Sequence, residues 1–191
     1  MYNSNYIVLD LEFNYPNTRF RSEHNGVILH DEIIEFGAVK LNSDLKQEST
    51  FCRFVKPTAY PKINREVQKL TDITTEMIWE GDPFHVVLKD FLEWCGDNPV
   101  FITWSDNDIF VLEDNIRYHG IDVGELPRCY DMQLMFDDQV TQEGRNFALS
   151  YAMWKMEIKP ALSHDALNDA INTAEVMRHL DLSEGLEEYE I

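Results

Sequence analysis

Residues 6–15, YIVLDLEFNY, place two carboxylates inside an apolar run, and this conflict constrains how the chain can fold. The aliphatic side chains favour burial, and successive side chains of a strand point to opposite faces. Asp10 and Glu12 therefore share one face, while Leu9 and Leu11 share the other. Two like charges on a largely buried strand repel each other and lose hydration. We therefore expect a cation beside Asp10 and Glu12.

The remaining patterns predict a single α/β domain. They indicate strands over residues 6–15, 32–41, 49–57 and 99–104, and helices over 63–70, 74–80, 84–95, 106–120, 147–156 and 163–180. Residues 14–30, rich in Asn, Arg and Pro, are expected to form a long loop. Because three strands come first and a later strand alternates with helices, we expect a mixed sheet. We assign residues 1–180 to this domain and residues 181–191 to an acidic tail that frays.

Composition favours a reduced, cytoplasmic protein. No stretch approaches the roughly 18 consecutive apolar residues of a membrane helix, so no membrane partner is expected. The start of the chain lacks the basic and apolar segments of a signal peptide. The three cysteines, Cys52, Cys95 and Cys129, form no CxxC pair, and we expect them in the core rather than at a metal.

The charge distribution argues against a general polyanion binder. The formal net charge is −19, and residues 96–191 hold 6 basic and 20 acidic side chains. One stretch differs, because residues 53–69 hold Arg53, Lys56, Lys62, Arg65 and Lys69 against Glu66 alone. This stretch is either ordinary solvated surface or a local patch that binds phosphates.

Further candidate ligands follow in later elements. Hard divalent cations prefer carboxylate oxygens, and Asp106 and Asp108 come directly after the buried strand 99–104. In the last helix, for which Ser163 is a candidate N-cap, Asp169 borders the apolar stripe and can face the sheet. Asp165 lies further out and suits the positive end of the helix dipole. His164 reaches the same site only from the non-helical entry to that helix. Each of these residues alone also has an ordinary structural explanation.

Taken in order, Asp10-x-Glu12, Asp108 and His164-x4-Asp169 resemble the DEDDh 3′–5′ exonucleases of the RNase H-like (DnaQ-like) superfamily. The resemblance covers roughly residues 5–180 and includes DEIIEFGAVKL, LTDIT and HDALNDAINTAEVM. DLEFN and TWSDNDIFVL most resemble the subgroup that trims structured or small RNAs, including the histone-mRNA 3′ exonucleases. The implied fold is an RNase H-like mixed five-stranded sheet flanked by helices.

The resemblance also implies a mechanism. Two divalent ions, Mg²⁺ or Mn²⁺, would be held by four carboxylates: Asp10, Glu12, Asp108 and Asp169. We prefer Asp108 to Asp106 because Leu112 follows it by four residues, and Asp106 then suits the helix N-cap. His164 would act as general base, with Glu12 as a second catalytic residue. The expected product is a nucleoside 5′-monophosphate released from the 3′ end of a single-stranded nucleic acid, with RNA favoured over DNA.

Substrate contacts are expected around this centre. Phe13 is a candidate for stacking on the terminal base or ribose, although an ordinary core role explains it almost as well. Leu70, in the LTDIT segment with Thr71, is a candidate wedge against a base. Three cations of the basic stretch are the candidate phosphate contacts: Lys62, Arg65 and Lys69.

Two other functions are compatible with parts of the sequence. A binding or regulatory module could keep the fold without catalysis. The His-Asp pairs at His30-Asp31 and His164-Asp165 also resemble those of HD-type nucleotide phosphohydrolases. That chemistry places its histidines on helices, whereas His30 precedes a predicted strand. We therefore favour the exonuclease.

Overall fold

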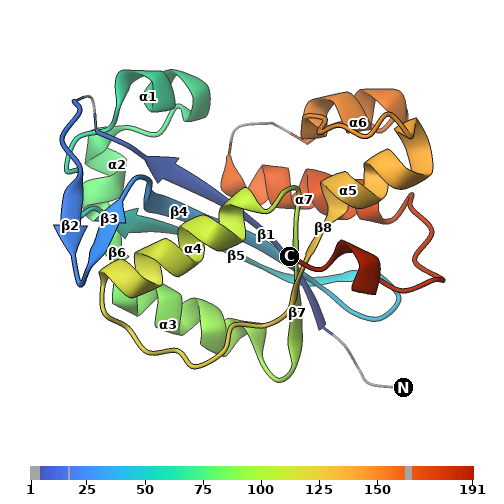
Figure 1. The fold of residues 1–191 in the computed structure, drawn as a ribbon, viewed down its shortest axis with the longest axis horizontal. Coiled ribbons are helices and arrows are strands. Elements are labelled where there is room, and N and C mark those ends of the chain that lie inside the picture. Colours follow the sequence, from blue (N-terminus) through green and yellow to red (C-terminus); the bar gives the residue numbers. More distant parts are fainter. Residues whose placement is uncertain (1–4, 17, 162–164) are drawn as a thin grey trace.

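The central sheet contains β1 (Asn5–Asn14), which carries Asp10 and Glu12, in a computed structural model that describes residues 5–16, 18–161 and 165–191. β1 pairs antiparallel with β4 (Glu32–Leu41), and β4 pairs antiparallel with β5 (Gln47–Lys56). On its other side β1 is parallel to β7 (Pro99–Thr103), which is parallel to β8 (Cys129–Asp131). The order β6-β5-β4-β1-β7-β8 confirms the mixed sheet (Figure 1). The sixth strand, absent from the expected five, is the two-residue β6 (Asp82–Pro83) at the edge.

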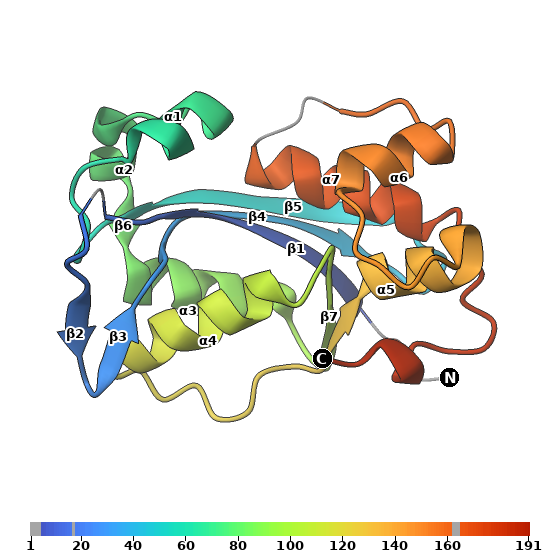
Figure 2. The same cartoon turned by 45° about the horizontal axis from the view of Figure 1, so that its top comes forward.

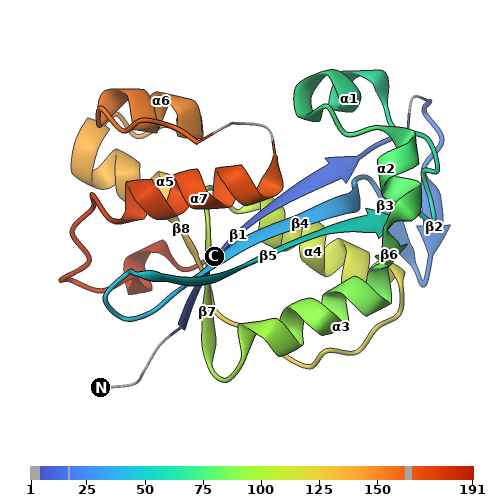
Figure 3. The ribbon, with the colours of Figure 1, turned by 180° about the vertical axis from the view of Figure 1, so that it is seen from behind.

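Helices cover both faces of the sheet. α3 (Phe84–Cys95) and α4 (Asn107–Tyr118) lie on one face, whereas α7 (Ala166–Met177) crosses β1, β4 and β5 on the other (Figures 2 and 3). α6 (Leu149–Lys155) packs on α7. α1 (Arg65–Thr71) contacts β1, and α2 (Thr75–Glu80) contacts β5. α5 (Met132–Phe136) continues into the short π-helix η1 (Asp137–Thr141), and the 3₁₀-helix η2 (Glu187–Tyr189) lies near the end of the chain.

β1 divides its side chains between two cores. Ile7, Leu9 and Leu11 belong to the apolar cluster on the side of α3 and α4. Val8 belongs to the cluster on the side of α7. Asp10 and Glu12 continue the alternation of Val8, so both point toward α7. The period of two read from the sequence therefore places the two carboxylates on one face.

The segment predicted as a long loop is partly wrong, because it contains a hairpin. β2 (Ser22–His24) and β3 (Val27–Leu29) pair antiparallel. Asn25 and Gly26 join them with positive φ angles of 50° and 75°, which a two-residue hairpin turn requires. The Asn-Gly pair at residues 25 and 26 was the sequence signal for this hairpin.

The acidic tail does not fray as expected. Leu186 is buried, and Glu190 forms an isolated bridge with Tyr130 of β8. The backbone N–H of Ile191 donates to the carbonyl of Cys129 at 3.0 Å. The tail therefore covers the exposed edge of β8. The expectation that all three cysteines lie in the core is also wrong for Cys52, which is exposed.

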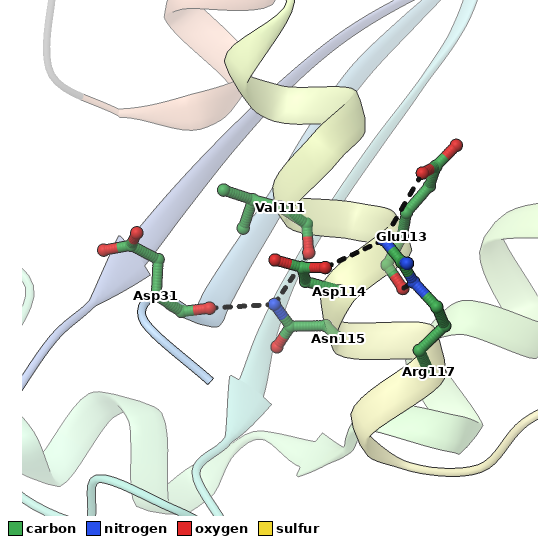
Figure 4. A network of polar contacts seen from close by, with 6 residues as sticks. All are labelled: Asp31, Val111, Glu113, Asp114, Asn115 and Arg117. Carbon is green, nitrogen blue, oxygen red and sulfur yellow. Dashed lines mark hydrogen bonds and ion pairs between the residues drawn. The ribbon is translucent and has the colours of Figure 1, made fainter. Parts of the chain in front are cut away.

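A buried asparagine fixes α4 to the sheet (Figure 4). Asn115 donates from Nδ2 to the carbonyls of Asp31 (2.9 Å) and Val111 (2.8 Å), and its Oδ1 accepts from the backbone N–H of Ile33 (3.1 Å). On the outer face of α4, Arg117 pairs with Glu113 and Asp114. Because Asn115 is fully buried and joins α4 to the start of β4, it holds the helix that carries Asp108.

None of the helices in the described segments combines the length and the apolarity that crossing a membrane needs.

Candidate metal centre

Three of the predicted carboxylates converge between β1 and α7. Asp10, Glu12 and Asp169 each offer an oxygen, and these oxygens lie within 4.8 Å of one another. Among the described residues this is the only group of three or more acidic, histidine or cysteine side chains that could hold a metal ion. Neither His30 nor Asp31 belongs to it, which disfavours the HD-type alternative.

A glycine allows α7 to approach the sheet closely enough for this convergence. Gly37 of β4 is the register partner of Asp10. A Cβ at Gly37 would lie 2.5 Å from the carbonyl oxygen of Ala166, and closer still to the Ala166 carbonyl carbon and the Leu167 nitrogen. Only a residue without a Cβ lets the first turn of α7 rest on β4 in this way. Asp169, one turn further along α7, thereby reaches Asp10 and Glu12.

Asp108 approaches the same place from the other face of the sheet. It lies in the first turn of α4, and its Oδ1 accepts a hydrogen bond from the backbone N–H of Leu11 at 2.9 Å. β7 pairs with β1 only as far as Val8, so this N–H has no partner in β7. Asp108 therefore satisfies the backbone donor between Asp10 and Glu12.

The predicted N-cap position of Asp106 is right, but its side chain does not cap the helix. Asp106 is the N-cap of α4 by position, but its side chain makes no capping hydrogen bond. Its backbone is already helical (φ −72°, ψ −15°), whereas a capping side chain needs an extended N-cap residue. Ser105 takes part of that role, because its Oγ accepts from the backbone N–H of Asn107 at 3.4 Å.

The electrostatics of the centre demand a counter-charge. Burial raises the pKa of Asp10 well above its ordinary value, and the nearby charge of Asp108 raises it further. Burial, followed by the charge of Glu35, raises the pKa of Glu12 to about 8. Burial raises the pKa of Asp108 to about 7, although its bond from Leu11 opposes the shift. In the described part of the chain, no Lys or Arg forms an ion pair with Asp10, Glu12 or Asp108. Without a cation the raised pKa values favour the protonated forms of these groups, whereas a bound cation would compensate the charges of their ionised forms.

Glu35 is a further acidic residue that the sequence analysis missed. It faces Glu12 across β1 and β4 and is buried. Its carboxylate accepts from the backbone N–H of Ala166 (3.4 Å) and from the Cys52 thiol (3.5 Å), and burial raises its pKa to about 7. Glu35 therefore fastens the start of α7 to the sheet. The signal was available, since EIIEFGAV carries a carboxylate within an apolar run as YIVLDLEF does.

The first turns of α7 are fixed by polar contacts. Asp165 is the N-cap, in place of the expected Ser163, and accepts from the backbone N–H of Asn168 at 3.1 Å. Asn172 donates to Asp169 Oδ1 at 3.2 Å and accepts from the backbone N–H of Ala161 at 2.8 Å. The predicted general base, His164, lies outside the described residues, as does Ser163.

The predicted substrate residues have different environments. Leu70 is 57% exposed at the end of α1, as a wedge requires. Phe13 is partly buried and packs against the core cluster beneath the sheet, beside a bulge where β1 and β4 shift register. Thr71 is buried, and its hydroxyl donates to the carbonyl of Val67 and accepts from the N–H of Ile73. The hydroxyl of Thr71 thus stabilises the end of α1 and is not available to a substrate.

The basic stretch is less available than its composition indicates. Arg53 pairs with Asp82 and Asp90, and Lys56 lies over the ring of Trp79 at 5.0 Å. Lys69 pairs with Glu66 at 2.9 Å on the surface of α1. Lys62 and Arg65 are exposed, and neither forms an ion pair within the described ranges.

Comparisons with known proteins agree with this fold. The family model described as "RNase_T: Exonuclease" matches residues 7–177. The probable 3′-5′ exonuclease KapD of Bacillus subtilis (strain 168) is 25% identical over 181 residues, which span 90% of this chain and 82% of KapD. Human ERI1 exoribonuclease 2 is 38% identical over 103 residues, but the match spans only 15% of that protein. The nuclease domain of 3′hExo, a DEDDh family member bound to rAMP, superposes with a TM-score of 0.79 at 21% identity, covering 97% of this chain and 95% of that one.

Proposed function

The chain belongs to the exonuclease family whose model spans residues 7–177, and on that premise we propose that it removes nucleoside 5′-monophosphates from the 3′ end of a single-stranded nucleic acid. The observation that carries this proposal is the convergence of Asp10, Glu12 and Asp169 beside Asp108. Like-charged carboxylates so close together destabilise a fold unless a ligand compensates them. A phosphodiester hydrolase uses such a ligand set for its metal ions.

The donor set fits hard divalent cations. Asp10, Glu12, Asp108 and Asp169 supply only carboxylate oxygens, which Mg²⁺ and Mn²⁺ prefer over softer ligands. We propose that these four side chains hold two such ions. When bound, the ions supply Lewis-acid stabilisation of the charge that develops on the attacking and leaving oxygens.

The protein groups position this centre and handle the proton. Asn172 orients Asp169, and Glu35 fixes the start of α7. We assign the general base to His164 on its place in the sequence, directly before the N-cap Asp165. A neutral imidazole there accepts the proton of the attacking water. Glu12 serves both as a ligand and as a hydrogen-bond acceptor for that water.

RNA is the favoured substrate. Three observations support this choice: the ERI1 exoribonucleases among the relatives, the rAMP bound to 3′hExo, and the similarity to an exonuclease that recognises the histone mRNA stem-loop at its 3′ end. Phe13 and the exposed Leu70 are proposed to contact the terminal nucleotide. Lys62, Arg65 and Lys69 are proposed to face phosphates.

The direct test follows strand shortening from each end. Single-stranded RNA and DNA oligomers labelled at the 5′ or the 3′ end are incubated with Mg²⁺ and resolved over time. A 3′–5′ exonuclease releases the 3′ label at once as a mononucleotide, while the 5′ label forms a descending ladder. Asp10→Asn is the matched inactive control. Binding of the oligomers without hydrolysis would instead support a regulatory module.

The phosphate contacts are tested by charge reversal. Lys62→Glu with Arg65→Glu changes the net charge as much as Lys46→Glu with Lys89→Glu, two exposed lysines that pair with local acids. Two lost phosphate contacts should flatten the slope of log affinity against log salt by ~1.4 for a single strand. The control pair should leave this slope unchanged. If both pairs of substitutions give the same slope, residues 53–69 are ordinary solvated surface and do not contact phosphates.

A further inference from the structure

A groove of about 940 Å³ opens beside the metal centre, between α6, the segment 157–160 and α7. Asp169, one of the three converging carboxylates, lines this groove together with Asn172. Met153 and Trp154 form part of its apolar wall. Its volume lies within the roughly 300–1,000 Å³ of ligand pockets. We call it the α6–α7 groove.

Trp154 is the most exposed large apolar side chain of this groove and is held from behind. Its side chain is 71% exposed. The indole contacts the ring of Tyr151, with centroids 5.6 Å apart, and Tyr151 stacks on Phe147 at 4.7 Å. Phe147 is buried, and its carbonyl accepts from the indole N–H of the buried Trp104 at 2.9 Å. A row of rings thus connects the core to an exposed aromatic surface, which suits stacking with a nucleobase.

Two lysines of the groove differ from the other basic residues in the acidic second half of the chain. Residues 96–191 contain six basic side chains: Arg117, Arg128, Arg145, Lys155, Lys159 and Arg178. All four arginines form ion pairs with acidic neighbours. Lys155 and Lys159 line the groove, are exposed, and form no ion pair within the described segments. Both are therefore available to an anionic ligand.

The position of the groove determines which part of a substrate it would meet. α1, which carries Leu70, and α6, which carries Trp154, lie on opposite sides of the region where β1 meets α7 (Figures 1 and 2). If the terminal nucleotide lies toward α1, a strand that continues past Asp169 enters the α6–α7 groove. This step rests on the proposed exonuclease function.

We propose that the α6–α7 groove binds the nucleotides immediately 5′ of the scissile phosphodiester, with a base stacked on Trp154 and the phosphates facing Lys155 and Lys159. The occupant is a single-stranded nucleic acid, because the groove is continuous with the metal centre and is lined by Lys155 and Lys159, which form no ion pair within the described residues, together with Glu157. A second copy of the chain is the competing occupant, and the test below distinguishes it.

The test compares two substrates. A single-stranded RNA oligomer has nucleotides 5′ of the scissile bond, whereas the p-nitrophenyl ester of a nucleoside 5′-monophosphate has none. Trp154→Ala should raise the KM for the oligomer roughly tenfold or more and leave kcat/KM for the ester within about twofold. Trp154→Phe should restore most of the oligomer affinity. Phe110→Ala removes an exposed aromatic ring from the solvent side of α4, and it should change neither the KM for the oligomer nor the kcat/KM for the ester.

The outcomes separate the groove from the proposed function. If the wild type cleaves both substrates and Trp154→Ala keeps the oligomer KM, the groove proposal is wrong and the exonuclease proposal stands. Equal losses on both substrates also overturn it, because they indicate damage to the centre. If the wild type cleaves neither substrate, the exonuclease proposal fails. Fluorescence quenching of Asp10→Asn by the oligomer, lost on adding Trp154→Ala, would then still support the groove. A dimer in sedimentation velocity that Trp154→Ala dissociates would identify a self-interface and overturn the proposal.

Discussion

Gly37→Ala tests whether the close approach of α7 to β4 builds the metal centre. The added Cβ would lie 2.5 Å from the carbonyl oxygen of Ala166, whereas ordinary contact begins at 3.4 Å. The first turn of α7 must therefore move by more than the difference, 0.9 Å, because the Ala166 carbonyl carbon and the Leu167 nitrogen lie closer still. Overpacking of this kind costs typically ~1–3 kcal/mol of stability. Because the same movement carries Asp169 away from Asp10, the affinity for Mg²⁺ or Mn²⁺ should fall as well.

Gly81→Ala is the control for Gly37→Ala. A Cβ at Gly81 would lie 2.6 Å from the carbonyl oxygen of Phe54, which is also too close but a milder clash than the one at Gly37, and no residue of the metal centre is involved. Both variants should unfold at lower urea concentration than the wild type. Only Gly37→Ala should weaken metal binding in calorimetric titration and lower kcat, since a displacement near 1 Å can cost about 100-fold in rate. Wild-type metal affinity in a folded Gly37→Ala protein would refute the reasoning.

Four further outcomes are expected. Mg²⁺ at one hundred times its Kd should raise the free energy of unfolding by roughly 2.7 kcal/mol, and Asp10→Ala should abolish this gain in calorimetry. Without metal, the pKa of Glu12 lies at about 8, above its ordinary 4.5, so between these pH values the folded chain retains a proton that the unfolded chain loses. The free energy of unfolding should therefore fall as the pH rises from 4.5 to about 8. A free energy of unfolding that stays constant over this range in the presence of chelator would contradict the prediction. Asp108→Asn keeps an acceptor for the Leu11 N–H but should abolish hydrolysis. Asp106→Asn should keep near wild-type activity and stability, because the Asp106 side chain makes no capping hydrogen bond. The opposite ranking of the two variants in the strand-shortening assay would exchange their roles. His164→Ala should keep metal affinity, lose roughly 10²–10⁴ in rate and lose the rise of rate with pH; an unchanged pH–rate profile would make His164 structural.

Local periodicity determined those parts of the site that one element defines. The period of two in YIVLDLEF places Asp10 and Glu12 on one face, and the structure keeps them there. The helical phase of the last helix directs Asp169 toward the sheet, where it meets both. The order of the acidic motifs along the chain was sufficient to indicate the exonuclease family, which the family model confirms.

Short elements escaped sequence analysis because they contain too few residues to show a period. β8 has three residues and α5 has five, and neither was predicted. The acidic tail looked unable to pack, yet its backbone pairs with β8 through Tyr130 and Cys129. Backbone hydrogen bonds of this kind depend on an unpaired strand edge nearby and not on the composition of the tail.

The tertiary structure alone decided the contacts between residues far apart in the chain. Asp108 reaches the N–H of Leu11 across 97 residues, and Glu35 reaches that of Ala166 across 131. The role of Gly37 follows from its contact with the first turn of α7, which the sequence does not show. The sequence also does not show which basic side chains can bind an anionic ligand. Arg53 forms ion pairs with acidic neighbours, whereas Lys155 forms none in the described part of the chain. A sequence pattern records which side of its own element a residue occupies, whereas the partner across the fold is set by how the elements pack.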